Sequence, residues 1–189
     1  ILTTSTGPET EPQPEPEPLP RPQPKPTPRV PTTTKDDDND KQFVNFDTSA
    51  AEAFGMVNPD YSNHPALPDI VRVVRGRQIV MTGTALAEFF NNLGAAGTVE
   101  TIRSHIFLSH VTPIADNPSV NVLQARARNP LGRRHDNRER DINIFGTGDQ
   151  YHIETITGDG AFVDFLRSNR ITLNPPAYVF RPPARFSGR

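Results

Sequence analysis

An acidic tract near the start of the chain has the spacing of a cation-binding loop. Asp36, Asp38 and Asp40 occupy positions 1, 3 and 5 of a twelve-residue calcium loop, and Asp47 occupies position 12. Such a loop needs a glycine at position 6 and usually a glutamate at position 12. Position 6 is Lys41, and position 12 is the shorter aspartate. We interpret the tract as a solvated joint, with these four aspartates as a weak calcium candidate, and expect no cofactor.

A basic stretch between residues 126 and 141 is the second candidate for chemistry. Its candidate partner-binding residues are Arg126, Arg128, Arg133, Arg134 and Arg138, and Arg140 belongs to the same stretch. Guanidinium groups bind phosphates, and they bind carboxylates across protein interfaces equally well. Acidic residues alternate with these arginines, and the loop has no aromatic residue for base stacking. The first interpretation is therefore a solvated loop, the second is contact with a neighbouring protein, and nucleic-acid binding is the third.

Two histidines form an alternative site. His110-Val111-Thr112 has the His-X-Thr pattern of two-histidine phosphoesterases, which hold a phosphate between two such motifs. The second motif would be His152-Ile153-Glu154, whose carboxylate would repel a phosphate. A phosphoester-binding hydrolase that uses His110 and His152 is thus the alternative function, and nucleic-acid binding through residues 126–140 is the third.

Three short motifs are excluded as catalytic signatures. Asp47-Thr48-Ser49 lacks the glycine and the second copy that an aspartic protease requires. The segments 146–148 and 158–160 contain glycines, but neither is followed by the lysine of a phosphate-binding loop. We expect the first to be a hairpin turn and the second to lead into a helix.

A proline-rich arm precedes the acidic tract. Prolines occupy every even position from Pro12 to Pro28, which excludes a helix. In an extended chain this alternation leaves the backbone amides of the odd positions on one edge. The candidate partner-binding residues of the arm are Gln13, Glu15, Glu17, Leu19 and Arg21. We expect an outstretched tether that could pair with one sheet edge of another chain.

Charges in this arm occur in blocks, with Glu-Pro repeats followed by Lys/Arg-Pro repeats. Over residues 9–29 this composition resembles the periplasm-spanning spacer of TonB-type proteins. The resemblance is one of composition and does not reach the rest of the chain, so no function is transferred from it.

The elements expected in the remaining chain are mostly short. Helices are expected over 47–54, with Asp47 as the N-cap, and over 84–93. Further helices are expected over a segment from 99 that leads into a strand near 111, and after 158–160. A hairpin is expected from strands at 70–74 and 78–81. Further strands are expected at 120–127, 142–145, 151–157, 171–173 and 178–180.

These elements predict an α+β domain over residues 43–189, with a mostly antiparallel sheet and two or three helices. Residues 1–42 would form the extended arm and acidic joint. The 189 residues carry a formal net charge of −2 and no cysteine, which exclude a strong basic field and thiolate metal sites. No apolar run approaches the ~20 residues of a membrane helix, and the start at Ile1 leads us to expect a processed precursor.

The function expected from these features is non-enzymatic. A strand-rich domain, a processed N-terminus and a reaching arm favour a structural, assembly or adhesion module of a virion, capsid or extracytoplasmic surface. Its partner would be a protein, either a neighbouring subunit or another copy, with nucleic acid the less favoured partner.

Overall fold

The computed structural model describes residues 29–31, 39–55, 67–128 and 135–180. The proline arm with its five candidate residues, two of the calcium candidates (Asp36 and Asp38) and two arginines (Arg133 and Arg134) lie outside the described residues. Asp40 lies in a described helix, but its side chain is not described.

Five parallel strands form the centre of the fold. They are β1 (Phe43–Phe46), β2 (Gln78–Thr82), β3 (Val111–Ile114), β4 (Thr155–Thr157) and β5 (Tyr178–Val179). Their order in the sheet is β3-β2-β1-β4-β5, so β1 is central and pairs with both β2 and β4. Every pairing is parallel. Parallel neighbours require long crossover connections, and helices supply them here.

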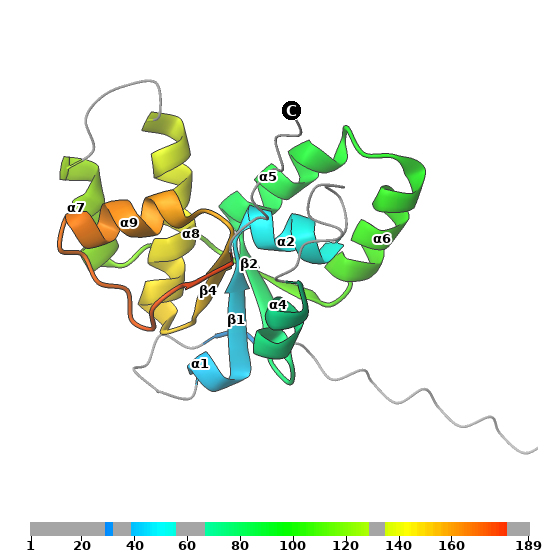
Figure 1. The fold of residues 1–189 in the computed structure, drawn as a ribbon, viewed down its shortest axis with the longest axis horizontal. Coiled ribbons are helices and arrows are strands. Elements are labelled where there is room, and N and C mark those ends of the chain that lie inside the picture. The colour runs from blue at the N-terminus through cyan, green and yellow to red at the C-terminus, as the bar shows by residue number, and fades with distance from the viewer. Residues whose placement is uncertain (1–28, 32–38, 56–66, 129–134, 181–189) are drawn as a thin grey trace, which may run out of the picture.

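Helices cover both faces of the sheet, which gives three layers (Figure 1). In chain order they are α1 (Asn39–Gln42), α2 (Thr48–Gly55), α4 (Leu67–Val74), α5 (Gly83–Leu93), α6 (Thr98–Leu108), α7 (Val120–Arg128), α8 (His135–Tyr151) and α9 (Gly160–Ser168). Figure 1 shows α2, α4, α5 and α6 on one side of the sheet, and α7, α8 and α9 on the other.

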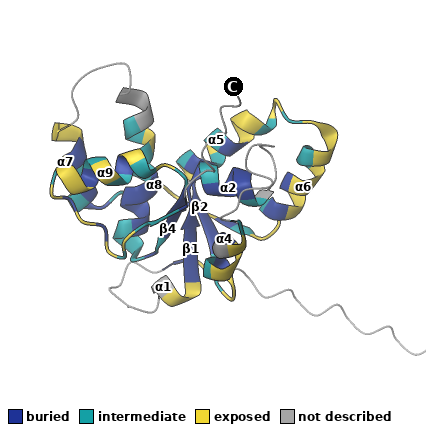
Figure 2. Ribbon diagram, in the orientation of Figure 1, coloured by how far each residue is buried: buried dark blue, intermediate teal, exposed yellow. Residues whose placement is uncertain are grey.

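The central strands are buried on both faces, as Figure 2 shows in dark blue. All four residues of β1 are buried, and Phe46 has no exposed surface. Its ring lies 5.7 Å from that of Phe54 in α2 and 6.1 Å from that of Phe107 in α6. On the opposite face, the Nδ2 atom of Asn45 donates hydrogen bonds to the Ile144 carbonyl oxygen and to Thr155 Oγ1, each at 3.1 Å.

The expected α+β class with a mostly antiparallel sheet and two or three helices is wrong. Three segments expected as strands are helical: 70–74 lies in α4, 120–127 in α7 and 142–145 in α8. In α4 the buried residues Ile70 and Val74 are four apart, so the helix places them on one face. The apolar residues in such short segments fit either period, and packing against the sheet selects the helix.

Other expected elements are confirmed. The structure has α2, α5 and α9 close to the expected bounds, and α6 leads into β3 as expected. The strand expected at 151–157 is present only as β4, and that expected at 178–180 only as β5, while 171–173 is not a strand.

The expected hairpin turn at 146–148 is also wrong, since both glycines lie inside α8. A Cβ atom added at Gly148 would lie 3.0 Å from the Ile153 carbonyl oxygen, and closer still to Thr155 Oγ1. One added at Gly146 would lie 2.6 Å from the Cβ of Pro118. These glycines therefore allow α8 to lie close to its neighbours.

Candidate acidic site at the carboxyl edge of the sheet

The strand order creates a crevice between the ends of β1 and β4. From β1 the chain proceeds outward through β2 and β3, and β4 and β5 then extend the sheet on the other side of β1. The helices that follow β1 and β4 leave toward opposite faces (Figure 1). In open parallel sheets, ligands bind at such a switch point, beyond the carboxyl ends of the strands.

Acidic side chains occupy this crevice. A pocket of about 400 Å³, open to solvent, is lined by Asp47, Thr48, Ser49, Glu52, Glu88, Asn91, Asn92, Arg140, Asp141 and Asp159. Five of these ten residues are acidic, and one is basic. Four separate parts of the fold supply four of the acids: Asp47 follows β1, Glu88 lies in α5, Asp141 lies in α8 and Asp159 lies beyond β4.

Asp47 is fixed in place by three donors. Its Oδ1 accepts a hydrogen bond from the Thr48 backbone N–H at 2.6 Å. Its Oδ2 accepts from Ser49 Oγ at 2.8 Å and from Thr157 Oγ1 at 2.7 Å. Burial raises the pKa of Asp47 and outweighs these hydrogen bonds, which lower it, while the charge of Glu88 raises it further. Asp47 also caps α2, as the sequence predicted.

The carboxyl group of Asp141 also has a raised pKa. Burial raises its pKa to about 8, and the negative charges of Asp47, Asp159 and Glu88 add to that effect. The positive charge of Arg138 acts in the opposite direction. Burial, together with the negative charges of neighbouring carboxylates, thus disfavours the ionised forms of Asp47 and Asp141.

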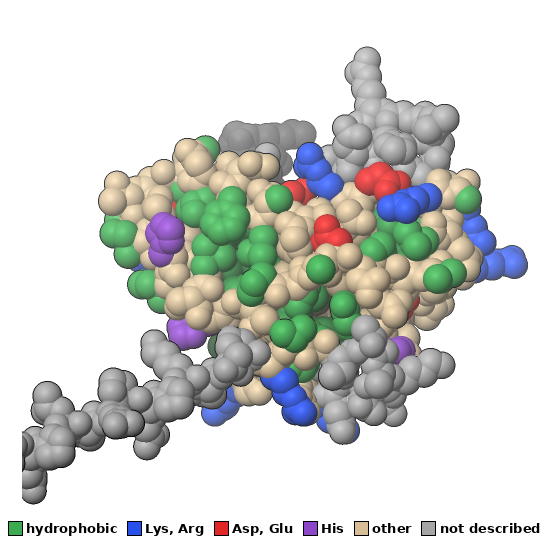
Figure 3. Space-filling model, turned by 180° about the vertical axis from the view of Figure 1, so that it is seen from behind, with side chains coloured by type: hydrophobic (Ala, Val, Ile, Leu, Met, Phe, Trp, Pro, Cys, Tyr) green, Lys and Arg blue, Asp and Glu red, His purple; other side chains and the backbone are tan. Residues whose placement is uncertain are grey.

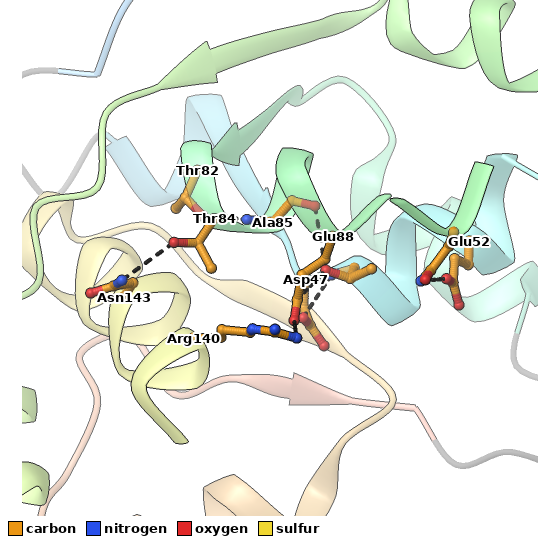
Figure 4. Close-up of polar contacts among 10 residues, drawn as sticks. Asp47, Glu52, Thr82, Thr84, Ala85, Glu88, Arg140 and Asn143 are labelled. Carbon is orange, nitrogen blue, oxygen red and sulfur yellow. Dashed lines mark hydrogen bonds and ion pairs between the residues drawn. The ribbon is translucent and has the colours of Figure 1, made fainter. Parts of the chain in front are cut away.

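Glu88 is engaged through both of its oxygens. Its Oε1 lies 3.0 Å from Arg140 Nη1, and its Oε2 accepts a hydrogen bond from Thr48 Oγ1 at 2.8 Å. Figure 4 shows the Arg140 side chain reaching from α8 toward Glu88 beside Asp47, with Glu52 farther along the pocket. Glu52 accepts a short hydrogen bond from Asn92.

The donor set suits a hard divalent cation, because it consists of carboxylate, hydroxyl and amide oxygens. Burial is the main cause of the raised pKa values of Asp47 and Asp141, and the negative charges of neighbouring carboxylates raise them further, an effect that such a cation would oppose. Within the described residues, however, no three histidine or acidic side chains are arranged so that they could hold a metal ion as they stand. Coordination by these residues would therefore require side chains to move. Glu88 already contacts two partners, Arg140 and Thr48.

The arginines of the basic stretch have partners within the chain. Arg126 and Arg128 lie on helix α7, not on a strand face as expected. Arg126 Nε lies 2.8 Å from Glu139 Oε2, and Arg128 donates a short hydrogen bond to the backbone oxygen of Asn169. The guanidinium of Arg138 lies over the Phe165 ring, 3.7 Å from its centroid. Whether these side chains also bind another protein stays a prediction.

The two histidines of the alternative hydrolase are not brought to the acidic pocket. His110 precedes β3 and His152 precedes β4, so both lie toward the amino ends of the strands. Neither lines the pocket, which lies at the opposite edge. His152 has a φ of 55°, and its Nδ1 lies 3.5 Å from Asn174 Nδ2.

Sequence reasoning missed Glu88, Asp141 and Asp159 and assigned Asp47 to other roles. Asp47 and Asp159 carry a local signal, because each follows a strand. Asp47 comes directly after the strand at 43–46, and Asp159 is the second residue after the strand at 155–157. Glu88 and Asp141 lie within helices and carry no such signal, because only the packing of α5 and α8 brings them to the pocket.

Fold and site together define a parallel α/β protein with a carboxylate-lined pocket at its switch point. Residues 61–184 match the family described as "Protein of unknown function (DUF1308)", and the chain belongs to this family. No curated protein matches the chain. A similar solved structure is the crystal structure of VapBC2 from Rickettsia felis bound to a DNA fragment from their promoter. It is 14% identical with a TM-score of 0.43, over 74% of this chain and 98% of that one.

The expected virion, capsid or adhesion module is therefore wrong. That expectation rested on a strand-rich antiparallel domain, and the structure has a helix-covered parallel sheet instead. The descriptions of the matching family and of the similar structure name no virion or capsid component. No helix among the described residues is long and apolar enough to cross a bilayer.

Proposed function

We propose that this protein is a divalent-cation-dependent phosphodiester hydrolase that acts on nucleic acid. The observation that carries the proposal is the convergence of Asp47, Glu88, Asp141 and Asp159, from four parts of the fold, on one solvent-open pocket. This proposal departs from the non-enzymatic function expected from the sequence, because the sequence did not reveal that convergence.

Electrostatics support a cation in this pocket. Five acidic side chains and one arginine line the pocket, and the pKa of Asp141 is raised first by burial and then by the negative charges of Asp47, Asp159 and Glu88. Such perturbed groups concentrate at functional sites, although structural networks also produce them. A pocket with this potential would repel a phosphate unless a cation were present, so a phosphate substrate and a metal cofactor belong together.

The residues have distinct tasks in this proposal. Asp47, Glu88, Asp141 and Asp159 would hold Mg²⁺ or Mn²⁺, and Ser49 and Thr157 keep Asp47 oriented. When bound, the cation would lower the pKa of a coordinated water and stabilise charge on the phosphate. Hydrolysis would convert a phosphodiester and water into a phosphomonoester and an alcohol. Because the pocket opens to solvent, a segment of a longer chain could enter it.

The decisive experiment combines metal binding with hydrolysis. We expect the full chain to bind Mn²⁺, followed by electron paramagnetic resonance, and to cleave fluorogenic single-stranded RNA or DNA in Mg²⁺ or Mn²⁺ but not in EDTA. Asp141→Asn should weaken Mn²⁺ binding and reduce cleavage at least a hundredfold, because it removes a carboxylate from the proposed ligand set.

Asp164→Asn is the matched control. Asp164 is an aspartate on α9 that pairs with Arg167 at 2.8 Å, with its side chain 71% exposed and outside the pocket. It should bind Mn²⁺ and cleave as the wild type does. A wild type that fails to bind Mn²⁺ at millimolar concentration, or cleavage that survives EDTA, would refute the proposal. The first result would indicate a site for an organic cation instead.

A further inference from the structure

Arg140 is the one basic side chain among the residues that line the acidic pocket. It projects from α8 with 51% of its side chain exposed, and it contacts Glu88 through Nη1 at 3.0 Å. Figure 4 shows this guanidinium at the end of an outstretched side chain, facing Glu88. An arginine in this place can bind a ligand in the acidic pocket, which a purely structural ion pair would not do.

Among the described residues, most N–H donors of Arg140 have no protein acceptor. A guanidinium has five N–H donors, and within the described part of the chain the contact with Glu88 is the polar contact that Arg140 makes. The remaining donors keep a fork that matches two oxygens of a phosphate. Its neighbour Arg138 has a different environment, since its guanidinium is stacked over Phe165.

Glu88 is the residue that Arg140 contacts and that the proposed cation would also contact. Both of its oxygens already have partners, Arg140 and Thr48. The described acidic groups are not arranged to hold a metal as they stand. A cation that binds Glu88 would compete with the positive charge of Arg140 for the same carboxylate, and the contact with half-exposed Arg140 is more solvent-screened than that with Thr48.

We propose that Arg140 binds the substrate phosphate and that it becomes available when Glu88 leaves it to ligate the cation. This inference rests on the proposed function and specifies how the same site couples its two ligands. Before the cation is present, Arg140 and Glu88 neutralise each other. Afterwards the guanidinium and the cation present two positive groups to one phosphate. This exchange of Glu88 between Arg140 and the cation accounts both for a basic residue inside an acidic pocket and for a ligand set that is not preassembled.

In the alternative interpretation, the ion pair between Arg140 and Glu88 has only a structural role and holds α5 against α8. Arg167 provides a control for it, since it forms another arginine–carboxylate ion pair, within α9. Arg167 and Asp164 lie 2.8 Å apart with side chains 76% and 71% exposed. Neither residue lines the pocket.

The test uses the full chain as wild type and as R140Q, R140K and R167Q, with circular dichroism to verify folding. Mn²⁺ affinity is measured by electron paramagnetic resonance. Phosphodiester binding is measured by fluorescence anisotropy, with a short labelled phosphorothioate single-stranded DNA in Ca²⁺. R140Q should bind Mn²⁺ about two- to fivefold more tightly, because the competing cation next to Glu88 is gone. It should bind the oligonucleotide at least tenfold more weakly.

R140K should restore part of the oligonucleotide affinity, because lysine keeps the charge and loses the fork. R167Q should match the wild type in both assays. An unchanged Mn²⁺ affinity or an unchanged oligonucleotide affinity in R140Q overturns this inference, while Mn²⁺ binding by the wild type leaves the proposed function standing. If the wild type itself binds no Mn²⁺, both fall.

Discussion

The pKa of Asp141 leads to a prediction about stability that requires no substrate. An isolated aspartate has a pKa of 3.8, and burial beside Asp47, Asp159 and Glu88 raises that of Asp141 to about 8. The folded protein therefore binds the proton more tightly than the unfolded chain does. The stabilisation of the folded state by the proton on Asp141 is complete below pH ~4, and it is lost progressively as the pH rises to about 8. Above pH 8 no further loss is expected from this group.

Asp141→Asn should remove this pH dependence, since asparagine does not ionise. Each pH unit between the two pKa values corresponds to about 1.4 kcal/mol, which sets an upper limit of about 6 kcal/mol. Screening of a partly exposed carboxyl reduces the expected gain to about 1–3 kcal/mol at pH 8. At pH 4 the two proteins should differ little through this group. The variant is thus expected to be the more stable protein at neutral and alkaline pH, although it loses the proposed activity.

The assay is urea unfolding at pH 4, 6 and 8 in a chelator, followed by circular dichroism, with Asp164→Asn as the exposed control. Addition of Mn²⁺ at pH 8 should then reverse the ranking. A ligand present at a hundred times its Kd stabilises the folded state by about 2.7 kcal/mol, and the wild type should gain most of that while Asp141→Asn gains less. A wild type and variant with the same pH dependence would refute the electrostatic reasoning.

Three further predictions concern the framework that holds the pocket, and urea unfolding tests each. Phe46→Ala should cost about 3–5 kcal/mol, because Phe46 is fully buried between the rings of Phe54 and Phe107; a loss below 1 kcal/mol would contradict this packing. Gly148→Ala should cost about 1–3 kcal/mol despite the better helix propensity of alanine, since its Cβ would meet the strand that follows α8; a stabilised variant would show that α8 lies farther out. Arg77→Met should cost about 1–3 kcal/mol, because it leaves Glu154 without a guanidinium 2.7 Å away; an unchanged midpoint would place this pair in solvent.

The sequence predicted the helices whose apolar residues and caps agree. In α5, Leu86, Phe89, Phe90 and Leu93 follow the helical period, and in α9 the side chain of Asp159 accepts from the Ala161 N–H at 2.8 Å as an N-cap. Both elements follow from neighbours within a few positions of one another. Local physics was sufficient there, because tertiary packing and local preference favour the same structure.

The sequence failed where short β-branched segments lie on the sheet. The segment 70–74 reads as a strand by composition, yet a strand would place Ile70 and Val74 on the same face as Arg72. The helix buries Ile70 and Val74 and leaves Arg72 exposed. Reading 70–74, 120–127 and 142–145 as strands removed the crossover helices. Without crossovers the sheet could only be taken as antiparallel.

That one error also concealed the pocket. In an antiparallel sheet the ends of successive strands alternate between two edges, so acids that follow them would be far apart. In the parallel sheet, the ends of β1 and β4 lie side by side, and Thr157 Oγ1 donates to Asp47 Oδ2 across 110 residues of sequence. Asp47 was therefore assigned in turn to a helix cap, a calcium loop and a protease motif, each tested only against residues near it. The acids of this pocket are related by topology and not by spacing, so no motif drawn from a continuous segment could have assembled them.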